Sequence, residues 1–398
     1  MKFKEIEIGT LDLSVIDGDR GKNYPHSNEL LEDGYCLFLS ANNVTKNGFV
    51  FNNNVYISKE KDEVLRKGKL LRNDIVITTR GTVGNVGLYD DSVKFERIRI
   101  NSGMLIIRCG PSVDSIFLYH VLKSKQFYEQ ILSIQTGSAQ PQLPKSHFLR
   151  MFVPNIPLPT QKQISSVLGT IDNKIATNTA INKNLAKQAQ AIFIQHFIDI
   201  ENTPDGWTEG SLTDIAEYLN GLAMQKFRPE NEDDGLPVLK IKELRQGICD
   251  SESDRCSSEI KRAYIVHDGD VIFSWSGSLL VDFWCGGDCG LNQHLFKVTS
   301  AKYDKWFYYA WTNHHLQEFV KMAADRATTM GHIKRDALEK ARVLVPNKED
   351  YNHIGTLLQP LYDSIIANRI ENRQLATLRD TLIPRLMSGE IDVSNIDI

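Results

Sequence analysis

The chain has 398 residues, of which 41% are hydrophobic and 24% charged, and its formal net charge at pH 7 is −4. No apolar run approaches the roughly 20 residues of a membrane span, and residues 1–8 alternate charged and apolar side chains unlike a signal peptide, so we expect a cytoplasmic protein. The acidic total excludes a uniformly basic nucleic-acid binder but allows a local basic face, and the six cysteines predict free thiols rather than a metal site.

The first 150 or so residues predict a mixed module of strands and helix. Apolar runs bounded by turn residues predict strands at 36–39, 50–51, 75–79 and 103–107. The run 116–132 has a helical pattern instead, which makes the module α plus β rather than all-β.

A long helix is expected to follow this module. Pro157 and Pro159 end the strand region, and Thr160 and Gln163 have the spacing of a capping box. No glycine or proline interrupts 170–200, and a helix over 160–200 would be roughly 60 Å long. Apolar or small residues at alternating steps of four and three predict a coiled-coil seam along it: Ile171, Ile175, Leu185, Ala189 and Ile192.

The second half repeats this order of elements. Apolar runs predict strands at 237–239, 270–275 and 295–298, and a helix is expected over 305–322. The aromatic residues at 306–311 are better explained by packing of this helix on a sheet than by stacking on bases. Asn347, with Asp350 three residues later, predicts the start of a second long helix.

The chain is an internal duplication. Ile175, Asn178, Asn182 and Leu185 recur 190 residues later (365 − 175) as Ile365, Asn368, Asn372 and Leu375. We therefore expect an α+β fold in which two similar α/β modules are separated by two long antiparallel coiled-coil helices, with pseudo-two-fold symmetry. The expected segments are module 1 at 1–156, helical region 1 at 157–203, module 2 at 204–346 and helical region 2 at 347–398.

Two asparagines lie on the seam of each helix, Asn178 and Asn182 on the first and Asn368 and Asn372 on the second. A polar residue at a seam position costs stability and fixes register, because a misaligned neighbour leaves its amide unpaired. The simplest partner for one asparagine pair is the other. The alternative is that all four lie on a solvated helix edge.

Module 1 has a glycine-rich loop at 78–87, directly after an apolar strand. Glycines let the backbone approach a phosphate, and the guanidinium of Arg80 matches O6 and N7 of guanine. The loop at 135–143 has two glutamine amides, at 140 and 142, that suit adenine, and the polar loop at 40–46 is a further candidate. For each loop the alternative is an ordinary turn. The candidate DNA-contacting residues of module 1 are Asn42, Asn43, Lys46, Thr79, Arg80, Thr82, Gln140 and Gln142.

Module 2 carries polar segments in the corresponding places. The loop at 274–278 again follows a strand, but it has no arginine, and a basic segment at 326–335 precedes the closing strand. Different residues at the same places predict different specificities for the two modules. The candidate DNA-contacting residues of module 2 are Lys240, Lys242, Trp275, Ser276, His332, Lys334 and Arg335.

Catalytic signatures are scarce. The sequence has no Gly-x-x-x-x-Gly-Lys-Ser/Thr loop, His-Glu-x-x-His motif or Gly-x-Ser-x-Gly elbow. Asp268 and Asp270 could bind magnesium in a nuclease, but acidic residues at the start of a strand also cap turns. We therefore predict no catalytic residue, no metal ligand and no cofactor.

At this point the chain resembles the specificity subunit of a Type I restriction-modification enzyme over essentially all its length. The closing stretch 382–391 looks typical of the family's second helical region, and 157–164 is similar to the entry into its first. The stretch 79–84 also resembles a loop that is common in its target-recognition domains. The second copy departs there, with 275–278 and no arginine.

The resemblance implies a non-catalytic DNA reader with two target-recognition domains, each of which reads one half of an asymmetric, bipartite target in double-stranded DNA. The paired helices would set the unread spacer and dock methyltransferase subunits, two by the pseudo-symmetry, and through them restriction subunits. S-adenosylmethionine, ATP and magnesium would belong to those partners. The alternative is an interaction scaffold whose coiled coil joins two binding modules for protein or small ligands.

Overall fold

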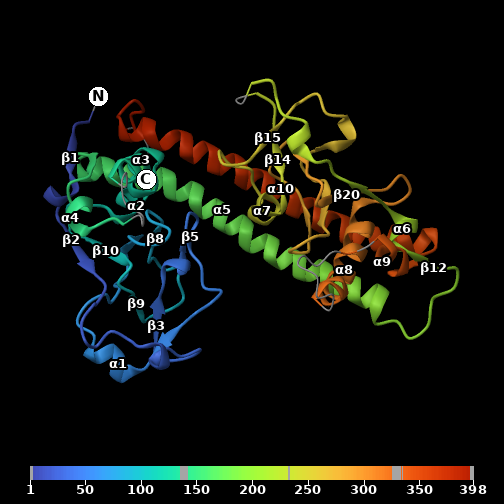
Figure 1. Ribbon diagram of the computed structural model, residues 1–398, viewed down its shortest axis with the longest axis horizontal. Helices are drawn as coiled ribbons and strands as arrows, with labels where there is room; N and C mark the ends of the chain where they lie inside the picture. The colour runs from blue at the N-terminus through green and yellow to red at the C-terminus, as the bar shows by residue number, and fades with distance from the viewer. Residues whose placement is uncertain (1–2, 135–141, 232–233, 325–332, 334, 395–398) are drawn as a thin grey trace. The chain divides into compact units, whose positions relative to one another are not determined.

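The structure is a computed structural model that describes residues 3–134, 142–231, 234–324, 333 and 335–394. It contains two compact units, Met1–Asn173 with Ala376–Ile398, and Lys174–Leu375. The long helices α5 (Leu158–Phe193) and α10 (Lys348–Met387) contribute residues to both units (Figure 1). Within the described ranges, no helix is long and apolar enough to cross a membrane.

The described part of the first unit has two main sheets and two short strand pairs, β1-β11 and β4-β5. An antiparallel sheet has the order β2-β10-β7-β8, and a second sheet, β6-β3-β9, pairs β3 with β9 in parallel. The strands are β1 (Glu5–Glu7), β2 (Leu13–Asp17), β3 (Cys36–Leu39), β4 (Val44–Thr45), β5 (Gly48–Phe49), β6 (Tyr56–Ile57), β7 (Ile75–Thr78), β8 (Val86–Leu88), β9 (Ile98–Ile100), β10 (Met104–Cys109) and β11 (Phe152–Pro154). The shorter helices are α1 (Lys59–Val64), α2 (Ser115–Lys123), α3 (Lys125–Ile134) and α4 (Lys145–Phe148).

The second unit repeats this topology with one more strand, β16, in its second sheet. Its antiparallel sheet has the order β13-β20-β17-β18, and its second sheet, β15-β14-β19-β16, pairs β14 with β19 in parallel. The strands are β12 (Thr208–Ser211), β13 (Glu217–Asn220), β14 (Leu236–Leu239), β15 (Arg255–Cys256), β16 (Ile265–Val266), β17 (Val271–Ser274), β18 (Leu280–Phe283), β19 (Cys289–Leu291), β20 (Leu295–Thr299) and β21 (Arg342–Val345). The shorter helices are α6 (Leu212–Ile215), α7 (Ile241–Gln246), α8 (Lys305–Ala324) and α9 (Arg335–Lys340). The internal repeat and the α+β class are thus confirmed.

Strand register defines which residues of the two copies correspond. Thr78 lies opposite Met104 in the first unit, and Ser274 lies opposite Leu295 in the second. Leu39 and Ile100 are likewise matched by Leu239 and Leu291. Position by position, Arg80 therefore corresponds to Ser276, and the segment 101–103 corresponds to 292–294.

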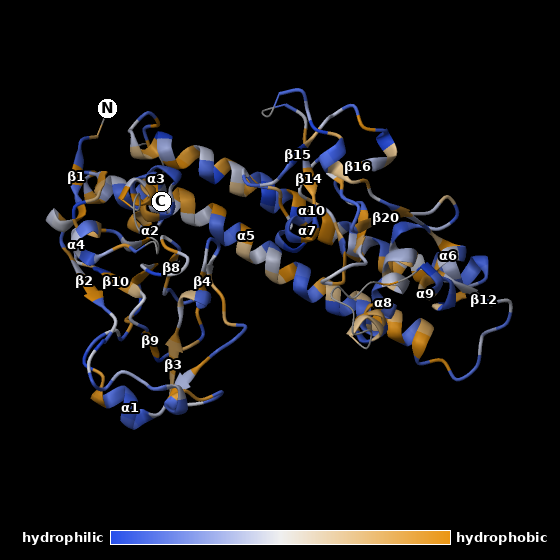
Figure 2. Ribbon diagram, viewed as in Figure 1, coloured by the Kyte–Doolittle hydropathy of each residue, from blue (hydrophilic) through white to orange (hydrophobic). Residues whose placement is uncertain are grey.

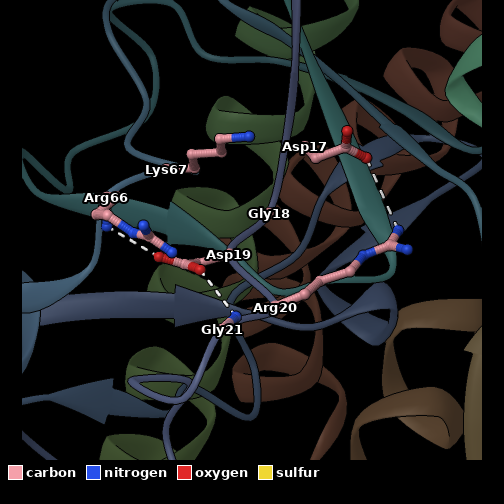
Figure 3. A pocket seen from close by; sticks show the side chains of 7 residues that line it. All are labelled: Asp17, Gly18, Asp19, Arg20, Gly21, Arg66 and Lys67. Carbon is pink, nitrogen blue, oxygen red and sulfur yellow. Dashed lines mark hydrogen bonds and ion pairs between the residues drawn. The ribbon is translucent and has the colours of Figure 1, made fainter.

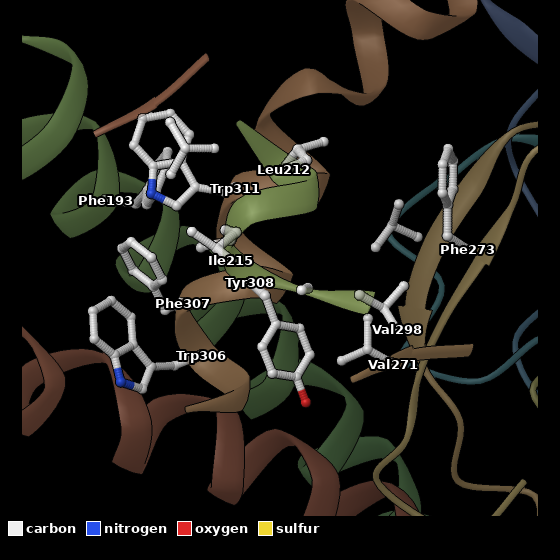
Figure 4. Close-up of a cluster of buried hydrophobic side chains, with 14 of the residues drawn as sticks. Phe193, Leu212, Ile215, Val271, Phe273, Val298, Trp306, Phe307, Tyr308 and Trp311 are labelled. Carbon is white, nitrogen blue, oxygen red and sulfur yellow. The ribbon is translucent and has the colours of Figure 1, made fainter. Parts of the chain in front are cut away.

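The hydrophobic cores contain the residues that the apolar runs predicted. In the second unit, Trp306, Phe307, Tyr308 and Trp311 on α8 pack with Phe273 of β17 in one buried cluster (Figure 4). The prediction that the aromatic segment is core is confirmed. In the first unit, Ile383 and Leu386 of α10 pack with Ile164 and Leu168 of α5 in the core that includes β7 and β10.

Three local predictions were wrong. The helix expected at 116–132 is two helices, because Ser124 hydrogen-bonds back to Val121 O and caps the second helix through Phe127 N. The strand near 50–51 lies at Gly48–Phe49 instead. Helix α5 begins at Leu158 rather than at Thr160, since Pro159 in the first turn needs no acceptor for an N–H.

Apolar and polar residues alternate along α5 and α10 (Figure 2). Helix α5 has 36 residues, about 54 Å at 1.5 Å per residue, and a π-helical turn, Ile194–Ile198, follows it. Helix α10 begins after Asn347, whose Oδ1 accepts the Asp350 N–H at 2.9 Å. This cap is the one that the sequence predicted.

Gly169→Ala in α5 is expected to raise the free energy of unfolding by about 0.5–1 kcal/mol, because alanine loses less backbone entropy in a helix. A Cβ at Gly169 would meet no atom within 4 Å. The matched control is Gly18→Ala, whose Cβ would lie 2.1 Å from Asn101 O and which should destabilise the first unit. Urea denaturation of the two variants checks the opposite signs; a destabilised Gly169→Ala would contradict the prediction.

Candidate nucleic-acid interface

The glycine-rich loop of the first unit is a tightly bonded hairpin that joins β7 to β8. The Thr78 hydroxyl donates to Thr82 O and accepts the Asn85 N–H at 3.0 Å. Gly81 has φ +73°, a left-handed conformation that favours glycine. The hairpin presents Arg80 and Thr82 as exposed side chains.

Two other polar segments predicted from the sequence meet this hairpin. Asn85 Nδ2 donates to Val44 O at 2.8 Å, which ties the hairpin to the segment that contains Asn42 and Lys46. Thr79 O accepts the Leu143 N–H at 3.0 Å, and Arg80 forms an isolated β-bridge with Gln142. Three loops that are distant in sequence thus form one surface.

The predicted residues differ in what they present on this surface. Asn42, Lys46, Arg80, Thr82 and Gln142 are exposed. Asn43 and Thr79 are each only 4% exposed. The Asn43 side chain accepts from Ser40 N at 2.9 Å and donates to Val50 O at 3.2 Å, so in the free chain it shapes its loop. Gln140 lies outside the described residues.

The second unit has the same hairpin frame with different side chains. The Ser274 hydroxyl donates to Ser278 O at 2.9 Å, and Gly277 has φ +65°. Trp275 O accepts the Ile333 N–H at 3.1 Å, as Thr79 O accepts Leu143 N–H in the first unit. The two units thus share the hairpin backbone but differ in its side chains. This difference suits two modules that recognise different sequences.

The predicted residues of the second unit are distributed around this hairpin. Lys242 and Arg335 are exposed, while Ser276 is 2% exposed. Lys240 lies half-buried and its Nζ is 2.5 Å from Asp254 Oδ2. Trp275 donates from Nε1 to Asn220 Oδ1 at 3.0 Å, which fixes the indole beside the end of β13. His332 and Lys334 lie outside the described residues.

Sequence reasoning missed a basic pocket at the same sheet edge of the first unit. The cavity, of about 270 Å³, is lined by Asp17, Gly18, Asp19, Arg20, Gly21, Arg66 and Lys67 (Figure 3). Hydrogen bonds from the backbone N–H groups of Arg66 and Gly21 hold the pKa of the Asp19 carboxyl below its usual value. Arg20 donates to Ser102 O at 3.1 Å. The pocket adds the cationic side chains of Arg20, Arg66 and Lys67, of which Arg20 also pairs with Asp17 at 3.7 Å, and such cations suit phosphate contacts. The sequence did not predict this pocket, because its lining comes from two segments about 45 residues apart and forms no local motif.

The four seam asparagines bond to each other across α5 and α10 in the second unit. Asn178 Nδ2 donates to Asn372 Oδ1 at 2.9 Å, and Asn368 Nδ2 donates to Asn182 Oδ1 at 2.8 Å, so the helices run antiparallel. Asn178 is 1% exposed, unlike a residue on a solvated edge. Of the apolar seam residues, Ile365 is buried, and Ile175, Leu185 and Leu375 are half-buried.

Ion pairs attach each long helix to its surroundings within one unit. In the second unit, Arg373 contacts Asp268 at 2.6 Å and Arg369 contacts Asp282 at 2.6 Å. In the first unit, Arg379 of α10 contacts Asp172 of α5 at 2.7 Å. The Asp268 carboxylate is thus used by Arg373, and Asp270 pairs with Lys297 at 2.7 Å. The described part of the chain also has no group of three or more His, Cys, Asp or Glu side chains that could hold a metal ion.

Asn178→Leu is expected to preserve the fold while relaxing helix register, because leucine packs in a seam but cannot bond to Asn372. The free energy of unfolding should change by less than roughly 1 kcal/mol, and the pairing of α5 with α10 should become heterogeneous. Disulfide cross-linking between cysteines placed on the two helices measures the register, and a single unchanged register would contradict this role. Asn184→Leu on the exposed face of α5 is the matched control.

Comparisons of the sequence with known proteins show its family. The model of the Type I restriction modification DNA specificity domain matches residues 4–187 and 204–377. The chain is 24% identical over 378 residues to the specificity subunit of the Type I restriction enzyme MjaIX of Methanocaldococcus jannaschii, with 86% of this chain and 84% of that protein covered. It is 24% identical over 414 residues to the EcoKI specificity subunit of Escherichia coli, with 95% of this chain and 83% of that protein covered.

A solved structure shares the fold. The S subunit of a Type-I restriction-modification system from M. genitalium aligns with a TM-score of 0.56 at 14% identity, covering 97% of this chain and 96% of that one.

Proposed function

Because the chain belongs to the Type I restriction-modification DNA specificity family, we propose that it is the DNA-binding specificity subunit of a Type I restriction-modification complex. Each globular module reads one half of a bipartite, asymmetric target. The observation that carries this proposal is the hairpin frame repeated in both units with different side chains, Arg80 in one and Ser276 in the other.

The exposed residues suit the two kinds of contact that sequence-specific binding needs. Direct readout of all four base pairs takes place in the major groove, where the Arg80 guanidinium can pair with guanine and the Gln142 amide with adenine. Lysines and arginines such as Lys46, Lys242 and Arg335 contact phosphates and position the module. Asn43 and Thr79 act within this proposal by holding the loops, because both are buried.

The remaining assignments follow the expected segments. We assign 1–156 and 204–346 as target-recognition domains and 157–203 and 347–398 as the helical regions that set the unread spacer and dock methyltransferase subunits. The internal repeat favours two such subunits, which in turn bind the restriction subunits. Catalysis, and with it S-adenosylmethionine, ATP and magnesium, belongs to those partners, and the complex works in the cytoplasm.

The test is retardation of duplex DNA in electrophoresis at low salt, with and without the methyltransferase subunit, followed by mapping of methylated sites in DNA exposed to the complete complex. We expect retention and one bipartite methylation pattern. Failure to retain any duplex under either condition would remove this function and favour the interaction scaffold.

A further inference from the structure

A short turn lies at the centre of each candidate surface, and the sequence did not single it out. In the first unit it joins β9 to β10 through 101–103, and in the second it joins β19 to β20 through 292–294. Strands β10 and β20 each lie between two neighbours whose ends form the same edge, β2 and β7 in one unit and β13 and β17 in the other. The turn therefore lies between the end of β2 and the hairpin in the first unit, and between the end of β13 and the hairpin in the second.

The two turns share one hydrogen-bonded frame. Asn101 Oδ1 accepts the Gly103 N–H at 2.8 Å, and Asn292 Oδ1 accepts the His294 N–H at 3.3 Å. The Asn101 N–H donates to Leu39 O at 3.0 Å, and the Asn292 N–H donates to Leu239 O at 3.2 Å. With the asparagine and its bonds preserved, the next two positions are Ser102 and Gly103 in one copy and Gln293 and His294 in the other.

The two units differ in which segment carries the large side chain. It is on the hairpin in the first unit and on the turn in the second. In the first unit the hairpin supplies Arg80 and the turn has Gly103, whose Cβ would lie 3.7 Å from Arg80 Cβ. In the second unit the hairpin has the buried Ser276, and the turn supplies His294. Each surface thus has one large polar side chain at this point, but it comes from a different segment.

The polar side chains of the second turn, Gln293 and His294, have unused hydrogen-bonding capacity in the free chain. His294 Nδ1 is buried and has no hydrogen-bond partner among the residues that the structure describes, and leaving such a group unpaired costs free energy. His294 Nε2 lies 3.4 Å from Gln293 Nε2, and the imidazole lies 6.2 Å from the Trp275 ring, centroid to centroid. Both side chains are half-buried, so a ligand that offers hydrogen bonds at this edge can draw them out.

We propose that Gln293 and His294 are specificity-determining residues of the second module and contact base edges, with His294 at the place that Arg80 has in the first module. This inference rests on the proposed function and deepens it. An amide can pair bidentately with adenine, and an imidazole can both donate to and accept from a base. At this point of the surface, the turn therefore reads the second half-site, whereas the hairpin reads the first.

The test uses the complete complex with methyltransferase subunits and maps methylated sites by sequencing. Replacing the turn by its first-module counterpart, Gln293→Ser with His294→Gly, should reduce discrimination at one or more bases of the second half-site by roughly tenfold or more, the scale of a bidentate base contact. The first half-site should keep its stringency and so serves as an internal control. Gln246→Ala, an exposed glutamine at the end of α7, is the matched surface control.

Two further variants separate a reading role from a folding role. Gln293→Ala and His294→Asn alter the side chains singly, and thermal unfolding should show that both fold. A second half-site whose discrimination is unchanged in folded single and double variants overturns the inference while the proposed function stands. A wild-type complex with no bipartite pattern refutes the proposed function instead.

Discussion

Arg99→Met is expected to lower the free energy of unfolding of the first unit by about 3–5 kcal/mol, because it removes one partner of a buried ion pair. Arg99 is 5% exposed and Asp62 is 3% exposed. The guanidinium donates to Asp62 Oδ1, to Asp62 O at 2.7 Å and to the carbonyls of Leu65 and Lys67. These bonds fasten the segment 62–67, which includes two residues of the basic pocket, to strand β9.

The loss of unfolding free energy in Arg99→Met should depend on pH. Burial alone would raise the pKa of the Asp62 carboxyl, but the hydrogen bonds from Arg99 and Lys69 outweigh it and hold its pKa below the usual value. A depressed folded-state pKa gives stability that is present above the unfolded value, about 4, and lost as the pH falls through the folded value. The difference in unfolding free energy between the wild type and Arg99→Met should therefore become smaller below about pH 4.

Urea denaturation at several pH values checks both statements. The matched control is Arg97→Met, an exposed arginine two residues earlier that lies over the Tyr35 ring at 4.5 Å, and its cost should stay below about 1 kcal/mol. Equal costs for the two variants would show that the Arg99 network contributes little.

Arg80→Ala is expected to weaken binding or relax one base of the first half-site by about 1–3 kcal/mol, the usual contribution of a bidentate base contact. The side chain is exposed on a hairpin whose shape is fixed by Thr78 and Gly81, and it makes no ion pair with another described residue. Its removal should therefore leave the fold unchanged. Methylation mapping and titration of specific and random duplexes measure the effect.

Arg80→Lys distinguishes the two possible contacts. Lysine keeps the charge but lacks the planar fork, so a base contact is lost while a phosphate contact survives. If Arg80 contacts only a phosphate, Arg80→Ala should weaken all duplexes alike and reduce the salt slope by about one. Unchanged affinity and methylation pattern in Arg80→Ala would mean that the hairpin is only a turn.

The sequence by itself determined the features that depend on local periodicity. The spacing of Ile175 and Asn178 recurs at Ile365 and Asn368, and this recurrence indicated the duplication. Two helices that pack through the same kind of seam need the same spacing of seam residues. The same local logic predicted the core strands at 36–39 and 75–79, the second of which ends at Thr78 in the structure, and the loop that carries Arg80. Short-range hydrogen bonds within one turn fix that hairpin, so its residues could be read from the chain alone.

Only the tertiary structure decided which segments share a surface and which of their side chains remain available. Asn292 is oriented by Leu239 O, and Arg20 reaches Ser102 O, through bonds between residues more than 50 positions apart. Burial of Asn43 and Thr79, and the correspondence of Arg80 with the buried Ser276, likewise follow from strand order and register rather than from any motif. Side-chain availability is set by neighbours that strand pairing brings together, and that pairing is not written in the spacing of residues along one segment.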